Sequence, residues 1–68
     1  MVINFFLNGY HYCSYRYLTL EELLDYFAFS DKVFIVEYND KLCNQTCWRK
    51  QIIKDDDKIE VISIVGGG

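Results

Sequence analysis

The side chains of this 68-residue chain that could do chemistry by themselves are one histidine and three cysteines. Together, His11, Cys13, Cys43 and Cys47 would supply the four ligands of a tetrahedral zinc site. However, Cys43 and Cys47 are four positions apart, wider than the Cys-x-x-Cys spacing of most zinc and redox sites. An odd number of cysteines without a secretory leader is typical of reduced thiols in an intracellular protein. We therefore expect packing thiols, and neither a bound metal nor a bound cofactor.

The second candidate for chemistry is the end of the chain, where Gly66, Gly67 and Gly68 follow an apolar run from Ile59 to Val65. The run indicates a buried strand. Glycine loses the most backbone entropy on ordering, so we expect residues 66–68 to form a mobile, exposed tail. A rigid strand that leads into a bare carboxylate points to the Gly68 carboxylate as the reacting group. A frayed terminus or the remnant of a tag would give the same sequence.

Size and charge exclude several classes of function. The chain has 51% hydrophobic and 25% charged residues and a net charge of −3, which is typical of one globular domain. Its few basic residues are scattered, which argues against nucleic acid as a partner, and no apolar run is long enough to span a membrane. The first residues lack the basic flank and cleavage site of a signal peptide. A domain of this size buries only about 60% of its unfolded surface, which favours function at a surface or a terminus.

The first half of the chain predicts a hairpin and a helix. Residues 3–7 alternate with a period of two, Asn8-Gly9 is typical of a tight hairpin turn, and residues 10–17 predict the returning strand. Thr19 and Glu22 have the spacing of a capping box. The apolar stripe that follows predicts a helix of about ten residues, which Ser30-Asp31 ends.

The second half predicts the rest of a sheet. Residues 33–38 are β-branched and aromatic, and we expect them to form its central strand, followed by a turn at Asn39-Asp40 and a short strand over residues 41–43. Residues 44–50 predict an irregular loop anchored by Trp48, and residues 54–57 a solvated turn. The last strand then covers residues 58–65.

This order of elements predicts an α+β domain of two layers over residues 1–65, with a flexible glycine tail over residues 66–68. Ile59 and Val61 should face the helix. Ile62 and Ile64 would then point the other way and, with Val65, form an apolar docking patch for a partner next to the tail.

Several segments resemble the β-grasp (ubiquitin-like) sulfur carriers, and most of all the sulfur carriers of thiamine biosynthesis, the ThiS family. The resemblance rests on six features: the opening strand that ends in Leu7-Asn8-Gly9, the helix start Thr19-Leu20-Glu21-Glu22-Leu23-Leu24, Val36-Glu37-Tyr38-Asn39, the region of Trp48, Asp57-Lys58-Ile59-Glu60-Val61, and the ending Val65-Gly66-Gly67-Gly68. The chain departs from the family at Asp40 and Asp56, where glycine is frequent, and at Cys43, where proline is common. These departures concern the shapes of loops and leave the tail intact.

The resemblance implies a β-grasp fold, with a mixed four- to five-stranded sheet packed on one helix. It also implies a carrier rather than an enzyme. An E1-like adenylyltransferase would use ATP to adenylate the Gly68 carboxylate, and sulfur from a cysteine desulfurase system would replace AMP to leave a thiocarboxylate. Thiazole synthase would accept that sulfur for the thiazole of thiamine. Gly66 and Gly67 would give access to narrow active sites, in the cytoplasm or the plastid stroma.

Three other functions are compatible with the same sequence. The chain could be the sulfur-carrying small subunit of molybdopterin synthase, a ubiquitin-like modifier of other proteins, or a plain β-grasp interaction module whose glycine tail has no role. The first two share the reacting carboxylate, and the third does not.

Overall fold

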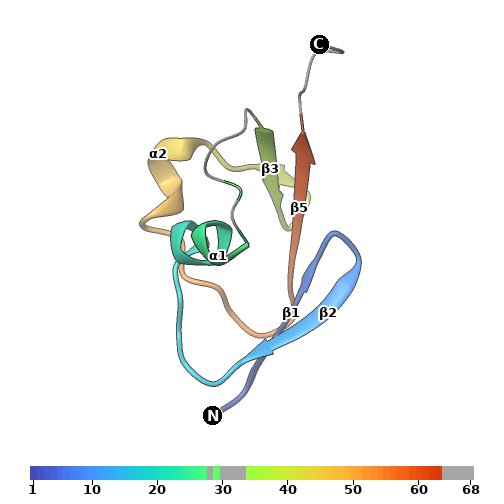
Figure 1. Cartoon of the computed structure of the whole chain (residues 1–68), viewed down its shortest axis with the longest axis vertical. Coiled ribbons are helices and arrows are strands. Elements are labelled where there is room, and N and C mark those ends of the chain that lie inside the picture. The colour runs from blue at the N-terminus through green and yellow to red at the C-terminus, as the bar shows by residue number, and fades with distance from the viewer. Residues whose placement is uncertain (28, 30–33, 64–68) are drawn as a thin grey trace.

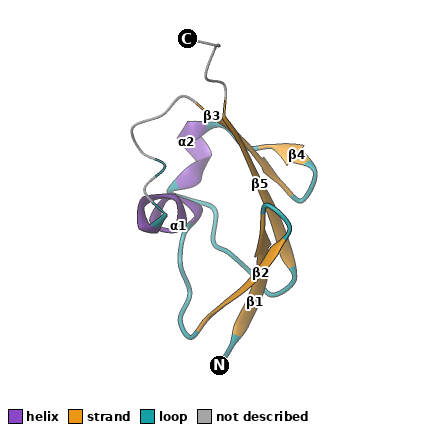
Figure 2. Cartoon of the chain, turned by 45° about the vertical axis from the view of Figure 1, so that its right-hand side comes forward, coloured by secondary structure: helices purple, strands orange, loops and turns teal. Residues whose placement is uncertain are grey.

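The computed structural model describes residues 1–27, 29 and 34–63, which form one mixed sheet and two helices (Figure 1). In chain order the elements are β1 (Ile3–Leu7), β2 (Tyr10–Ser14), α1 (Leu20–Tyr26), β3 (Phe34–Tyr38), β4 (Lys41–Leu42), α2 (Gln45–Trp48) and β5 (Asp57–Ser63). The strands are ordered β2-β1-β5-β3-β4. Of the described strands, β1 and β5 pair in parallel, and the other neighbouring pairs are antiparallel. Both helices lie on the same side of the sheet (Figure 2), so the expected two-layer α+β architecture is confirmed.

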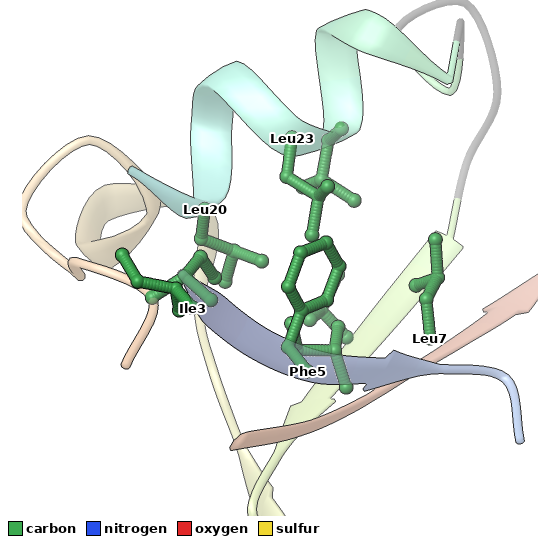
Figure 3. Packing of buried hydrophobic residues seen from close by; sticks show 9 residues of the cluster. Ile3, Phe5, Leu7, Leu20 and Leu23 are labelled. Carbon is green, nitrogen blue, oxygen red and sulfur yellow. The ribbon is translucent and has the colours of Figure 1, made fainter. Parts of the chain in front are cut away.

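The core lies between this sheet and α1. The alternating apolar residues of β1 point toward the leucines of α1, as Figure 3 shows for Ile3, Phe5, Leu20 and Leu23. Among the described residues, the buried apolar side chains are those of Ile3, Phe5, Leu7, Leu20, Leu23, Leu24, Val36, Ile53 and Ile59. Each such side chain stabilises the fold by about 1.5–3 kcal/mol relative to its exposed state. No helix among the described residues is long and apolar enough to cross a membrane.

The predicted hairpin turn is confirmed, because Asn8 and Gly9 both have positive φ, at 51° and 83°. The strand after it is shorter than expected and ends at Ser14 instead of Tyr17. The Ser14 hydroxyl donates to the carbonyl oxygen of Arg16 at 2.6 Å and accepts from the Arg16 N–H at 3.3 Å. These local bonds bend the backbone away from the sheet, which ends the strand pairing.

The capping box at the start of α1 is also confirmed. Thr19 Oγ1 accepts from the Glu22 N–H at 3.1 Å, and the Glu22 carboxylate accepts from the Thr19 N–H at 2.8 Å. The helix is shorter than expected, with seven residues instead of about ten. It ends because Phe27 leaves helical geometry and packs edge-on against Tyr12 with ring centroids 5.1 Å apart. The predicted stop at Ser30-Asp31 lies outside the described residues.

Two expectations about the sheet region were wrong. The central strand is β5 rather than β3, because β5 lies between β1 and β3 and pairs with both. Residues 45–48 form the one-turn helix α2 where an irregular loop was predicted. Trp48 anchors this segment as expected, because its ring stacks on Phe34 at 5.1 Å and its Nε1–H donates to the Cys43 carbonyl at 2.9 Å.

Candidate functional site

The strand that leads to the glycine end is the most firmly held strand of the sheet. β5 pairs with β1 along its first three residues and with β3 from Ile59 onward, where the partners run from Tyr38↔Ile59 to Phe34↔Ser63. Its third residue, Ile59, has no exposed surface. Figure 1 shows β5 running away from the N-terminus to the opposite end of the molecule. The strand can therefore carry the residues after it without distortion of the core.

Beyond the end of β1, Asn8 continues the hydrogen bonding to β5. We call an asparagine that bonds to β5 through both its backbone and its side chain a clamp. Asn8 lies in the hairpin turn, and its backbone N–H donates to the Ile59 carbonyl at 2.9 Å. Its side-chain Oδ1 accepts from the Val61 N–H at 2.7 Å. The side chain thus satisfies a backbone donor that β1 is too short to reach, and it extends the support of β5 toward the chain end.

A second asparagine clamps the other edge of β5. Asn39 exchanges two bonds with Lys58: its N–H donates to the Lys58 carbonyl at 2.7 Å, and its Oδ1 accepts from the Lys58 N–H at 2.8 Å. Its amide nitrogen donates to Asp57 Oδ1 at 3.0 Å. Asn8 and Asn39 both hold left-handed backbone, with φ of 51° and 52°, a conformation that asparagine tolerates better than most residues.

Asp57 corrects the expectation of a fully solvated turn at residues 54–57. Only 7% of its surface is exposed, and its Oδ2 accepts from the Lys54 N–H at 2.7 Å. Burial raises the pKa of this carboxyl, and the Lys54 N–H lowers it to a smaller extent. Asp57 therefore closes the turn that enters β5.

The side chains of β5 alternate between the two faces of the sheet as predicted. Ile59 is buried, Val61 packs against the core, and Ile62 is 48% exposed on the face away from the helices. Ile62 is the one residue of the predicted docking patch that the structure describes. Ile64 and Val65, the glycines Gly66, Gly67 and Gly68, and the boundary between residues 1–65 and the tail all lie outside the described residues.

Sequence reasoning missed the partner of Ile62 across the sheet. Ile35 of β3 is directly opposite Ile62 and is 39% exposed. Side chains opposite each other in an antiparallel pair point to the same face, so these two isoleucines form one apolar surface. The alternation of β3 could have indicated Ile35, because its neighbour Val36 belongs to the core.

The thiols and the histidine are divided between opposite edges of the sheet. His11 and Cys13 are on β2, and His11 Nε2 lies 2.9 Å from Asn4 Oδ1. Cys43 and Cys47 flank the start of α2, where burial, and then the nearby Cys47, raises the pKa of the Cys43 thiol. Within the described ranges, no three histidine, cysteine or acidic side chains gather in a way that could hold a metal ion.

Comparison with known proteins places this geometry in a family. The family model described as "ThiS family" matches residues 7–68, which is most of the chain and includes its glycine end. Three similar proteins share the name "Uncharacterized protein ycf40". The one from Trieres chinensis is 44% identical over 94% of this chain and 88% of its own length. The one from Pyropia yezoensis is 39% identical over 91% and 87%.

A solved structure matches the fold as well. The crystal structure of the thiamine biosynthesis protein (ThiS) from Geobacter metallireducens aligns with a TM-score of 0.81 and 25% sequence identity. The alignment covers 97% of this chain and 100% of that chain. Together with the five-stranded mixed sheet, this match confirms the expected β-grasp fold.

Proposed function

The chain belongs to the ThiS family of small sulfur carriers, and we propose that it carries sulfur for the thiazole of thiamine on a thiocarboxylate at Gly68. Members of this family are carriers and not catalysts. The chemistry would therefore take place in partner enzymes, and this chain would act as their co-substrate.

The observation that carries the proposal is the extent of the family match, which continues through Gly66 and Gly67 to Gly68. Two features of the fold support it. The central strand β5 is held on both edges and ends two residues before the glycines in the sequence. The exposed Ile62 near the end of that strand offers an apolar contact for a partner.

The chemistry requires activation because a carboxylate is a poor electrophile. In the first step, an oxygen of the Gly68 carboxylate attacks the α-phosphorus of ATP, and pyrophosphate leaves. In the second step, a persulfide sulfur of a cysteine desulfurase system attacks the carbonyl carbon, and AMP leaves. A thiol then breaks the sulfur–sulfur bond and is oxidised to a disulfide, which frees the thiocarboxylate. This anionic sulfur is a strong nucleophile, by analogy with a thiolate.

The partners follow from these steps. An E1-like adenylyltransferase would bind the ATP, and thiazole synthase would accept the sulfur. Gly66 and Gly67 lack side chains that could obstruct a narrow active-site cleft. Three residues span about 10 Å when extended, which is enough to place Gly68 inside an enzyme while the folded body stays at its surface.

Thiamine synthesis and the plastid stroma are the finer parts of the proposal. The printed name of the Geobacter protein refers to thiamine biosynthesis, which favours this pathway over molybdopterin synthesis. The relatives named ycf40 carry a designation of plastid-encoded genes, which favours the stroma over the cytoplasm.

Intact mass spectrometry tests the proposed chemistry. The purified chain is incubated with the E1-like adenylyltransferase of the same organism, ATP, cysteine desulfurase, cysteine and a thiol. We expect a product heavier by the mass difference between sulfur and oxygen, with the change located at Gly68 by fragmentation. An unchanged mass, or a mass change at a cysteine, would contradict the thiocarboxylate.

A growth test separates the two sulfur-carrier pathways. The gene is expressed, together with its adenylyltransferase, in a strain that requires thiamine because its own carrier is deleted. We expect growth without thiamine. Rescue of a molybdopterin-deficient strain instead would assign the chain to the other pathway.

A further inference from the structure

β2 forms one edge of the sheet, and among the described residues no strand pairs with its outer side (Figure 1). The strand, Tyr10–Ser14, contains no acidic residue, lysine, arginine or proline. Edge strands of natural proteins are often protected by such residues, because an open row of backbone donors and acceptors pairs readily with another chain. The outer edge of β2 is therefore free to pair.

The hydrogen bonds of β1 indicate which backbone groups of β2 lie on this edge. The Asn4 carbonyl accepts from the Asp56 N–H at 2.6 Å, so the even-numbered residues of β1 direct their backbone groups toward β5 and the odd-numbered ones toward β2. Tyr12 is paired with an odd-numbered residue of β1 and bonds to it. Its neighbours His11 and Cys13 therefore direct their N–H and C=O groups to the open edge, and both residues are exposed.

A second copy of this chain can satisfy all of these backbone groups at once. In an antiparallel pair of β2 strands with a two-fold axis at Tyr12, His11 of each copy lies opposite Cys13 of the other copy. Each such pair exchanges two backbone hydrogen bonds. A shift by two residues in either direction moves one of these partners outside Tyr10–Ser14. The free edge thus selects a single symmetric register.

The same register places an exposed tyrosine of each copy beside a hollow of the other. Tyr10 and Ser14 share the helix-facing side of β2, because their partners in β1 belong to the core. Tyr10 is 70% exposed, and in the symmetric pair it lies opposite Ser14 of the second copy. Ser14 lines a hollow of about 330 Å³ between β2 and α1, together with Leu23 and Phe27. Each copy therefore offers a tyrosine side chain to the hollow of the other.

We propose that this chain forms a symmetric dimer through β2, in which Tyr10 of each copy fills the hollow between β2 and α1 of the other copy. A tyrosine suits the hollow, because apolar side chains line it together with the exposed ion pair of Arg16 and Glu22, whose Nη1 and Oε2 lie 3.9 Å apart. The net charge of −3 disfavours contact between two copies in general, but the paired strands carry no formal charge. The dimer is independent of the proposed function, because β2 lies on the opposite side of β1 from β5.

Sedimentation velocity over a series of concentrations tests the dimer, in a reducing buffer so that no disulfide links two copies. We expect a monomer–dimer equilibrium in the micromolar to millimolar range, because the contact is small. Tyr10→Ala should raise the dissociation constant about tenfold without a change in unfolding temperature. The matched control is Tyr17→Ala, because Tyr17 is 60% exposed but lies outside β2 and does not line the hollow. A wild type that stays monomeric, or a dimer that Tyr10→Ala leaves unchanged, would overturn the inference.

Charged side chains on the edge test the register. In a dimer of H11E/C13E, glutamates would lie opposite one another, and in a dimer of H11K/C13K lysines would do so, so each variant alone should be monomeric. Circular dichroism first verifies that both are folded. An equal mixture of the two should restore a dimer with one copy of each, since every glutamate then lies opposite a lysine. A mixture of folded variants that stays monomeric would overturn the inference.

Hydrogen exchange in the wild type needs no substitution, and it decides the matter if the charged variants do not fold. The amides of His11 and Cys13 should exchange more slowly as the protein concentration rises and the dimer forms. The amide of Tyr12 bonds to β1 and should be protected at every concentration. If the rates at His11 and Cys13 stay constant while a dimer forms, the contact lies elsewhere and the inference is wrong.

Discussion

In the part of the chain that the structure describes, the residues other than glycine with left-handed backbone are asparagines and aspartates in turns: Asn8, Asn39, Asp40 and Asp56. The asparagine side chains gain hydrogen bonds to β5 from this geometry. The aspartates have φ of 69° and 68° and stand at the two positions where the resemblance to the sulfur carriers implies glycine. At Asp40 and Asp56, the backbone thus has a conformation that suits glycine, although both residues carry a side chain.

Replacement of Asp56 by glycine should therefore stabilise the protein. Asp56→Gly relieves left-handed strain, and we expect the free energy of unfolding to rise by about 0.5–1 kcal/mol. The matched control is Asp55→Gly in the same turn. Asp55 Oδ1 accepts from the Asn4 N–H at 2.7 Å, so this change should destabilise the protein. Urea denaturation measures both variants, and equal effects of the two changes would contradict the interpretation.

The buried carboxyl of Asp57 should make stability depend on pH in an unusual direction. Burial raises its pKa above the ordinary value of 3.8, so the folded protein binds this proton more tightly than the unfolded chain. This contribution to stability is fully present below pH 3.8 and is lost as pH rises through the raised folded pKa. Glu22 acts oppositely: the Thr19 N–H lowers its pKa below 4.5, and its contribution is lost as pH falls through the lowered value.

The variant Asp57→Asn isolates this effect, because Glu22 is common to both proteins. The stability of the wild type relative to the variant should decrease between about pH 3 and about pH 7, by about 1.4 kcal/mol for each unit by which the folded pKa is raised. Chemical denaturation at several pH values gives the difference. An increase with pH would mean that hydrogen bonds to the ionised carboxylate outweigh its burial.

Among the helices and strands, the features predicted correctly are those that depend on contacts between residues close together in the sequence. The Asn8-Gly9 turn and the capping box of Thr19 and Glu22 each involve residues within a few positions, and both are present as predicted. The position of β5 at the centre of the sheet depends on long-range pairing that no local pattern encodes. The early end of α1 also depends on tertiary contacts, since Phe27 leaves the helix to meet Tyr12.

Within the candidate site, too, local features were predictable and long-range contacts were not. The direction of Ile62 followed from the alternation of a strand, and its exposure agrees. The asparagine clamps could not be predicted, because Asn8 bonds to a residue 53 positions away and Asn39 to one 19 positions away. The reacting glycines were inferred from sequence and resemblance alone, and their role stays a prediction.

The Asn8 clamp should control how well the end of β5 is held. Asn8→Gly keeps left-handed backbone accessible but removes the acceptor of the Val61 N–H. We expect a loss of about 1–2 kcal/mol in the free energy of unfolding, and faster hydrogen exchange at the Val61 amide than at Ile59. Asn8→Asp retains an acceptor and should stay close to the wild type. Unchanged exchange at Val61 in Asn8→Gly would show that the side chain does not support β5.

The exposed isoleucine at the end of β5 should matter for docking more than for folding. Ile62→Asp should change the free energy of unfolding by less than about 1 kcal/mol, because Ile62 is 48% exposed. We expect the affinity for the adenylyltransferase to fall about tenfold, since a charge replaces an apolar contact. Ile52→Asp is the matched control, because Ile52 is 44% exposed but lies between α2 and β5, outside the five strands. If Ile62→Asp unfolds the protein, the outward direction of this side chain is wrong.

For the whole molecule, the proposed function separates a folded body from a reacting end. Among the described residues, the core and the clamps around β5 are formed within residues 3–61. Stability and reactivity should therefore respond to different substitutions. Changes in the core should lower stability first, and changes at the glycine end should alter the chemistry without a cost to the fold.

Deletion of Gly67 and Gly68 tests this separation most directly. The truncated chain should unfold within about 0.5 kcal/mol of the wild type, because the deleted residues contribute no side chain to the core. Sulfur transfer, measured as thiocarboxylate formed by intact mass, should be abolished, since the reacting carboxylate then sits too far from ATP. Gly67→Ala should form less thiocarboxylate than the wild type while it unfolds identically, because its methyl group must enter the same cleft. Thiocarboxylate formation by the truncated chain at the wild-type rate would show that Gly68 is not the reacting residue.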